Sequence, residues 1–310
     1  MTELNRRALL RTAALAGMAT AAGLAGGLTT AAPAGAADST DVANGPWLVS
    51  VGQGVLRIDP DRRTPQRLLS WGDEFSASPD GRWLAFVAGD LFLMDLATGA
   101  VRQVTDRAGV RHQWPTWSPD GTRVAVTRNG EALDIIDVAT GAAEEVISGH
   151  PISRPDWSRD GSMFAFWWRS RSEGPQLRTL TLATGKMRRI YLPEAAGETF
   201  GWPAFLPNNQ RVVFCTNRWT RDTDVPGGAA LASVRVDGTG LKRLTDETRF
   251  YMSPVYSPDG RYCAALSVPE TNPYPDGGNI IVATDGFGAS WWIPGDEYDY
   301  STRLTWARAL

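Results

Sequence analysis

The sequence has few of the residues that most often carry catalysis and metal binding. Its 310 residues include only two histidines and two cysteines, which are too few for a multi-histidine metal site and allow at most one disulfide. No Gly-x-Ser-x-Gly segment occurs, which excludes that form of serine nucleophile. Beyond about Leu28, no apolar stretch is long enough to span a bilayer. These absences remove several enzyme classes without naming a function.

Lysine is also scarce, and the balance of charge is acidic. Lys186 and Lys242 are the only lysines, and the formal net charge is −3. Residues 1–36 hold three arginines and one glutamate, so their removal would lower the charge to −5. A mildly acidic surface disfavours binding to a phosphate backbone. We therefore expect no nucleic-acid partner, and we expect a monomer.

The two cysteines, Cys215 and Cys263, fall on corresponding predicted strands. Counted from the preceding turn, they point to opposite faces and differ in height by about 10 Å along a strand, more than a disulfide tolerates. We predict two buried free thiols, with a disulfide as the alternative.

One turn sequence recurs through the chain. Ser-Pro-Asp-Gly occurs in full three times, with two weaker copies between the second and the third. The copies start at Ser78, Ser118, Ser158, Leu206 and Ser257. Pro at the second position, Asp bonding to nearby backbone and Gly in a left-handed conformation are typical of a tight turn. A spacing of about 40 to 50 residues is typical of blades in a β-propeller.

Each copy lies within the same order of predicted strands. A short extended stretch precedes the turn, a strand that is apolar on both faces follows it, a third strand ends in a second turn, and an alternating strand closes the unit. In the first unit these strands are residues 75–77, 83–87, 91–96 and 101–105. The pattern predicts five four-stranded units.

The two ends of the chain predict a sixth unit. Residues 47–51, 55–58 and 66–69 match second, third and fourth strands, and residues 303–306 match a first strand. We therefore predict an all-β fold: one six-bladed β-propeller over residues 47–310, whose C-terminal strand completes the N-terminal blade and closes the ring. Closure would remove two exposed sheet edges. An open sandwich with a frayed end is the alternative.

The repeat resembles that of TolB-type propellers. The matching segments are Pro115-Thr116-Trp117-Ser118-Pro119-Asp120-Gly121 and Pro254-Val255-Tyr256-Ser257-Pro258-Asp259-Gly260, with Leu244-Thr245-Asp246 and Val104-Thr105-Asp106 as strand endings. Ala77 in place of an aromatic residue and Asn208-Asn209 in place of Asp-Gly depart from the pattern. The resemblance spans nearly all of residues 47–306 and implies architecture more than function, because these residues form turns and core.

The first 36 residues have the features of an export signal, and residues 37–46 are expected to form a linker. Arg6-Arg7 precedes a stretch rich in Ala, Gly and Leu, and Ala34-Gly35-Ala36 offers a cleavage site near Ala36. The segment resembles a twin-arginine signal; an ordinary Sec signal is the alternative. Either route predicts a secreted or extracytoplasmic protein with no transmembrane segment, and the absence of cysteine after the signal argues against a lipid anchor.

The candidate ligand-binding residues lie where the longer loops are expected. In a propeller, the residues just before the first strands should rim the central channel on the face that carries these longer loops. The aligned positions are Glu74, Trp114, Arg154, Trp202, Ser253 and Arg303; His112, Tyr251 and Tyr300 lie near them, and the loops add Arg218, Trp219 and Tyr274. Arginines, a carboxylate and aromatic rings suit an anionic or aromatic ligand. Alternatively, the tryptophans plug the ring and the charges pair with one another.

Carboxylates in two loops offer ligands for Ca²⁺, but neither group has the spacing of a defined calcium loop. The groups are Asp222 with Asp224, and Asp296, Glu297 and Asp299. Solvated loops are the alternative, and we expect neither a metal nor another cofactor.

These features favour a non-catalytic binding module for a protein, a peptide or a cell-envelope component. Two alternatives stay open. One is a propeller lyase or hydrolase with its active site in the central funnel, where a carboxylate pair such as Glu74 with Glu270 or Asp276 would act. The other is an accessory or sensor protein of a secreted pathway.

Overall fold

The computed structural model describes ten segments of the chain. They are residues 44–51, 54–59, 66–72, 74–170, 172–219, 230–245, 249–269, 279–284, 290–293 and 304–308. All of them belong to one compact unit, Ala43–Leu310. The predicted export signal lies outside the described residues. Within them, no helix is both long enough and apolar enough to cross a membrane.

Five sheets are each built from four consecutive antiparallel strands, as the repeat predicts. The first comprises β4 (Glu74–Ala77), β5 (Trp83–Ala88), β6 (Asp90–Asp95) and β7 (Val101–Gln103). The second comprises β8 (His112–Trp117), β9 (Arg123–Arg128), β10 (Ala132–Asp137) and β11 (Ala143–Ile147). The third comprises β12 (Ile152–Trp157), β13 (Met163–Ser170), β14 (Gly174–Thr181) and β15 (Lys186–Tyr191).

The fourth and fifth sheets repeat this order. The fourth comprises β16 (Phe200–Phe205), β17 (Arg211–Thr216), β18 (Ala230–Arg235) and β19 (Lys242–Arg243). The fifth comprises β20 (Arg249–Tyr256), β21 (Tyr262–Pro269), β22 (Asn279–Thr284) and β23 (Ser290–Ile293).

One further sheet combines strands from the two ends of the described chain. It has the order β24-β1-β2-β3, where β1 is Asn44–Val51, β2 is Gly54–Ile58, β3 is Gln66–Leu69 and β24 is Leu304–Arg308. Trp306 pairs with Trp47 across β24 and β1, as Trp157 pairs with Phe164 in the third sheet. The indole Nε1 of Trp306 donates to the carbonyl of Gly45 at 3.0 Å.

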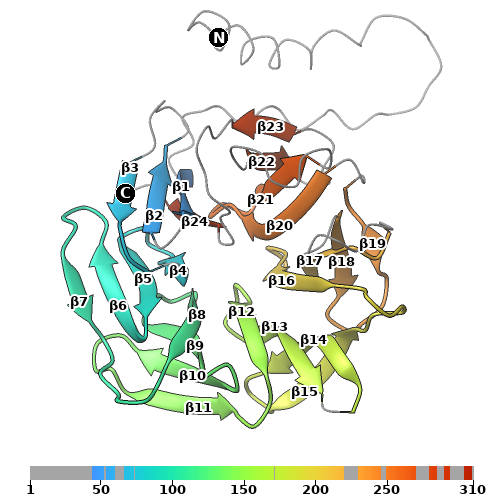
Figure 1. Ribbon diagram of the computed structural model, residues 1–310, viewed down its shortest axis with the longest axis horizontal. Coiled ribbons are helices and arrows are strands. Elements are labelled where there is room, and N and C mark those ends of the chain that lie inside the picture. The colour runs from blue at the N-terminus through green and yellow to red at the C-terminus, as the bar shows by residue number, and fades with distance from the viewer. Residues whose placement is uncertain are drawn as a thin grey trace, which may run out of the picture. The chain divides into compact units, whose positions relative to one another are not determined.

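The sheets are arranged around a common axis with their first strands innermost (Figure 1). Contacts between these strands run from β4 through β8, β12, β16 and β20 to β24, and β24 also contacts β4. Apolar side chains fill the spaces between neighbouring sheets, and the largest of them include Phe75, Phe86, Phe164, Phe166 and Phe214, all fully buried. The fold is an all-β propeller.

The recurring turns are locked by the same local hydrogen bonds. In the first, the Ser78 hydroxyl donates to Asp80 at 2.5 Å and accepts from the Trp83 amide at 2.8 Å, and Gly81 has a φ of 79°. The same Ser-to-Asp bond is present at Ser118, Ser158 and Ser257. The serine hydroxyl and one carboxylate oxygen are thereby engaged in each of these turns, so we interpret the turns as scaffold.

Both cysteines are buried free thiols, as predicted. Burial raises the pKa of Cys215 and of Cys263 to about 12. A thiol with so high a pKa carries almost no thiolate at neutral pH, so both cysteines act as apolar core residues.

Candidate functional site

The first strands of four sheets share a β-bulge just before a proline. The pairing register shifts between Gln113 and Thr116 in β8, and at the matching place in β12, β16 and β20. The residue before the proline has positive φ in each case: Trp114 (53°), Arg154 (53°), Trp202 (50°) and Ser253 (51°). Bulky residues seldom adopt this conformation, and bulges commonly re-aim side chains near functional sites. Four of the six rim positions aligned from sequence are thus structurally equivalent and strained; Glu74 does not share this bulge, and Arg303 lies outside the described residues.

At the centre of this group, the Arg154 guanidinium lies between two indole rings. Its carbon is 4.4 Å from the centroid of the Trp114 ring and 4.0 Å from that of the Trp202 ring. Cation–π contacts are worth about 0.5–2 kcal/mol each, depending on desolvation. Three sheets therefore contribute to one cation-centred stack.

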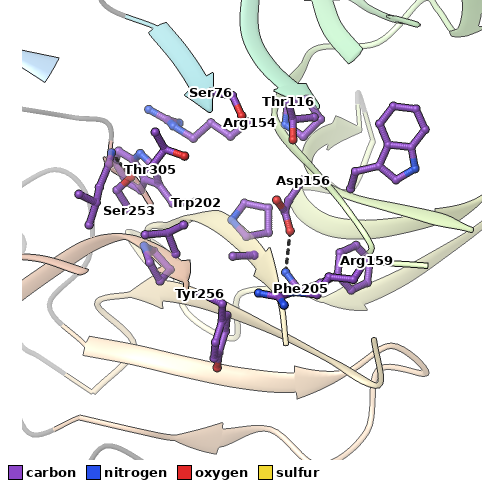
Figure 2. A pocket seen from close by; sticks show the side chains of 17 residues that line it. Ser76, Thr116, Arg154, Asp156, Arg159, Trp202, Phe205, Ser253, Tyr256 and Thr305 are labelled. Atoms are coloured by element: carbon purple, nitrogen blue, oxygen red, sulfur yellow. Dashed lines mark hydrogen bonds between the residues drawn. The ribbon is translucent and has the colours of Figure 1, made fainter. Parts of the chain in front are cut away.

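Arg154 and Trp202 line a cavity of about 150 Å³ along the central channel. Two residues further along each first strand, all six sheets contribute an equivalent residue to the lining: Ser76, Thr116, Asp156, Ala204, Val255 and Thr305. Figure 2 shows Arg154 and Asp156 directed into this space from the same strand, β12. The cavity would hold a single side chain or a small ionic group.

Arg159 approaches the same cavity from the turn face. Its guanidinium donates to the carbonyls of Ser257, at 2.5 Å, and Pro258, at 2.9 Å, in the turn after β20. Its amide donates to Asn209 in the turn after β16 at 2.9 Å. The backbone and side chain of this one residue thus connect the turns of three sheets. Burial lowers the pKa of Arg159, while Asp156 and Asp259 act in the opposite direction.

The channel carboxylates join neighbouring strands. Glu74 accepts from the Trp114 amide at 2.6 Å, and Asp156 accepts from the Phe205 amide at 2.7 Å (Figure 2). Ser253 does the same for the Leu304 amide at 3.0 Å. Each bond runs from one first strand to the next, so these groups hold the inner strands together.

Two residues predicted at the rim lie between sheets instead. Tyr251 is buried in a cluster with Cys215, Val213 and Leu231. His112 is 1% exposed, and among the residues that the structure describes neither of its imidazole nitrogens has a hydrogen-bond partner. Burial lowers the pKa of His112; Asp90 and Asp134 oppose that shift, and Arg107 and Arg128 add to it.

His112 should make the protein less stable in mild acid. Its folded-state pKa lies below the unfolded value of about 6.5, so the stabilisation is present above pH 6.5 and is lost as the pH falls toward the folded pKa. The free energy of unfolding, measured in urea between pH 7.5 and 5.5, should decline less steeply in His112→Phe than in the wild type. Equal slopes for the two proteins would contradict this assignment.

The two described loop candidates contact residues of the third and fourth sheets and are not part of the cavity lining. Arg218 forms an ion pair with Glu194 and donates to the Tyr191 hydroxyl at 3.3 Å. Burial and a hydrogen bond to Glu198 raise the pKa of Tyr191 to about 12. Trp219 packs against the apolar cluster between the third and fourth sheets, with Arg243 above its ring at 5.9 Å.

The other candidates lie outside the described residues: Tyr274, Tyr300 and Arg303, and all five carboxylates considered for Ca²⁺. Within the segments that the structure describes, no group of three or more His, Cys, Asp or Glu side chains is placed to hold a metal ion.

Sequence reasoning missed Asp156, Arg159 and Tyr256 in the lining. Asp156 could have been predicted from the sequence, because it lies two positions after Arg154 in the same alignment of first strands. Arg159 could have been singled out because it occupies a turn position where the other copies have proline.

Comparison with known proteins supports the fold. No family model matches the chain. An uncharacterized protein of Agrobacterium fabrum is 25% identical over 250 residues, which cover 72% of this chain and 82% of that protein. Dipeptidyl-peptidase 5 of Porphyromonas gingivalis is 24% identical over 166 residues, or 46% of this chain. The match spans only 24% of the peptidase.

Among solved structures, TolB of Acinetobacter baumannii superposes with a TM-score of 0.65 and 17% identity, over 86% of this chain and 66% of that one. A putative TolB of Agrobacterium tumefaciens superposes with a TM-score of 0.61 and 16% identity, over 86% of this chain and 98% of that one. An oligogalacturonate lyase in complex with manganese superposes with a TM-score of 0.55 and 18% identity, over 81% of this chain and 74% of that one. The chain has a TolB-like β-propeller fold. Because both TolB structures and an oligogalacturonate lyase share this fold, the function of this protein has to be argued from its site.

Proposed function

We propose that this protein is a non-catalytic binding propeller for a protein, a peptide or a cell-envelope component. The observation that carries the proposal is the Arg154 guanidinium between Trp114 and Trp202 beside the channel cavity. A cation held on aromatic faces and supplied by three sheets is pre-organised to receive an anionic or aromatic group. The ligand would enter from the face that carries the long loops.

The channel carboxylates favour binding over acid–base chemistry. Glu74 and Asp156 each accept a hydrogen bond from a backbone amide of the next sheet. A general acid or base has to exchange its proton with a substrate, and these oxygens are committed to joining strands. The likeness to an oligogalacturonate lyase nevertheless favours a second candidate, a propeller lyase acting in the same channel.

We also propose that the propeller is a six-bladed ring closed by β24. The pairing of β24 with β1 supports this proposal, as do its contacts with β20 and β4. Export by the twin-arginine route, with cleavage near Ala36, completes the proposal; it rests on Arg6-Arg7 and the apolar stretch that follows.

Arg154→Met tests the binding site. Residues 37–310 would be used to select ligands from a peptide-display library, and the affinity of each selected peptide would be measured for wild type and variant. Loss of one charge-assisted hydrogen bond, about 1.5–3 kcal/mol, should weaken binding by roughly 10- to 100-fold. Arg82→Met is the matched control, because Arg82 also lies over a ring, that of Trp83 at 4.9 Å, but on the turn face.

The same variants separate the two candidates. Peptides that bind Arg154→Met as tightly as wild type would place their site elsewhere and contradict the proposal. Turnover of oligogalacturonates that depends on Arg154 would establish the lyase instead. The cation–π stack predicts that Arg154→Met also loses about 1–3 kcal/mol of stability, so affinities should be compared well below its melting temperature.

A further inference from the structure

Three hydroxyl groups line one side of the channel cavity. Thr305 of β24, Ser76 of β4 and Thr116 of β8 occupy equivalent positions in three consecutive sheets, and all three line the cavity. Their residues are only 9%, 9% and 6% exposed, respectively. Figure 2 shows their side chains around the same space. Within the described part of the chain, none of these three hydroxyls makes a hydrogen bond.

The fold itself does not require polar side chains at these positions. The equivalent residues of the fourth and fifth sheets, Ala204 and Val255, also line the cavity and are apolar. A buried hydroxyl without a partner costs free energy, because it has lost its bonds to bulk water. Three such groups on one side of a single cavity are accounted for by a bound group that accepts their hydrogen bonds.

The charged side chains of the lining indicate the charge of that group. Among the described residues that line the cavity, only Arg154, Arg159 and Asp156 carry a formal charge, and these charges sum to +1. A ligand with one negative charge balances them. A doubly charged phosphate would place an additional negative charge near Asp156, and it would leave the apolar side of the cavity, Ala204 and Val255, without a contact.

We propose that the channel cavity binds a single carboxylate carried on a short apolar stem. This inference rests on the proposed function, because it makes Arg154 the cation that pairs with the ligand. The three hydroxyls donate to the carboxylate oxygens, and the stem lies against Ala204 and Val255. A cavity of about 150 Å³ holds a group the size of benzene, which is also about the size of butyrate. The carboxylate belongs either to a free acid or to the end of a peptide.

The turn side of the cavity favours a chain end over an internal segment of a peptide. Arg159 lines the cavity and extends from the turn after β12 to the turn after β20, where it donates to the carbonyls of Ser257 and Pro258. A chain that enters from the face with the long loops therefore meets an anchored side chain. Its C-terminal carboxylate is the group that reaches the hydroxyls.

Calorimetric titration of residues 37–310 with small probes tests the proposal. The probes are butyrate, butyramide, inorganic phosphate, and an acetylated tripeptide that ends in valine, either as the free acid or as the C-terminal amide. Butyrate should bind at least tenfold more tightly than butyramide, because a hydrogen bond to a charged group is stronger than one to a neutral group. Binding of the tripeptide acid but not its amide identifies a chain end as the ligand. Binding of butyrate but of neither tripeptide identifies a free acid.

Thr116→Val and Thr305→Val each remove one hydroxyl and keep the shape of the side chain. Each should weaken butyrate binding about tenfold. The ligand-free variants should melt no lower than the wild type, because an unpaired hydroxyl is replaced by a methyl group. Thr179→Val is the matched control: Thr179 is also buried (4% exposed) but does not line the cavity, so this variant should bind butyrate like the wild type.

Wild-type affinity for butyrate in both Thr116→Val and Thr305→Val would overturn the hydroxyl site. Equal affinity for butyrate and butyramide, no binding of any probe, or tighter binding of phosphate would overturn the choice of a carboxylate. Failure of the proposed function is a different result, since that function requires peptides whose binding depends on Arg154. Such peptides can be found even if the hydroxyl variants bind every probe like the wild type.

Discussion

A chain that ends at residue 300 is expected to melt about 10–20 °C below the full-length protein, or to aggregate. The deletion removes β24, in which Leu304 is 3% exposed and Trp306 is 9% exposed. Burial of two such side chains contributes about 3–6 kcal/mol, a large part of the 5–15 kcal/mol that is typical of a domain. The deletion also leaves β1 as an unpaired edge strand and exposes the sides of β4 and β20 that contact β24.

Thermal unfolding followed by circular dichroism, with light scattering for aggregation, measures this effect. A chain that lacks only residues 309–310 is the control, because β24 ends at Arg308. A synthetic peptide of residues 301–310 should restore part of the lost stability when it is added to the truncated protein. If the truncated and full-length proteins melt together, β24 does not close the ring.

The repeat units could be predicted from sequence because their turns depend on neighbours in the chain. In Ser78–Pro79–Asp80–Gly81, every bond that locks the turn joins residues at most five positions apart. The pairing of β24 with β1 was also within reach, since a first strand without a blade and a blade without a first strand complement each other. Both inferences use patterns that a single chain displays.

The site was only partly predictable, because it depends on distances between sheets. Alignment of the first strands gave Trp114, Arg154 and Trp202 as one group, and the structure brings their side chains together. The alignment could not give side-chain direction at a bulge, nor the depth of His112, which lies buried between sheets. Arg218 pairs with Glu194 from another loop, and neither loop has a repeat that would have predicted the contact.

Arg159 is the residue whose replacement should cost most among the channel side chains. Proline stands at its position in the other four turns, at Pro79, Pro119, Pro207 and Pro258. The guanidinium instead donates two hydrogen bonds across to the turn that contains Ser257. Hydrogen bonds from a charged donor contribute about 1.5–3 kcal/mol each, and the cost of burying the cation offsets part of that gain. We expect a net loss of about 2–4 kcal/mol in Arg159→Met.

Urea unfolding of Arg159→Met, Arg159→Pro and Arg82→Met tests whether the guanidinium bonds cause this loss of stability. Arg159→Pro restores the proline of the other turns and pre-sets the turn dihedral, a gain of about 0.4–1 kcal/mol. It also loses the bonds to Ser257 and Pro258 and the amide that donates to Asn209, so it should be no more stable than Arg159→Met. Arg82→Met, which removes an arginine whose side chain is 59% exposed, should change stability by less than about 0.5 kcal/mol. If Arg159→Met is as stable as Arg82→Met, the turns after β12 and β20 are held together without the guanidinium. If Arg159→Met is destabilised and Arg159→Pro is no more stable than Arg159→Met, Arg159 holds the turn-side end of the channel in place, and ligand access is left to the face with the long loops.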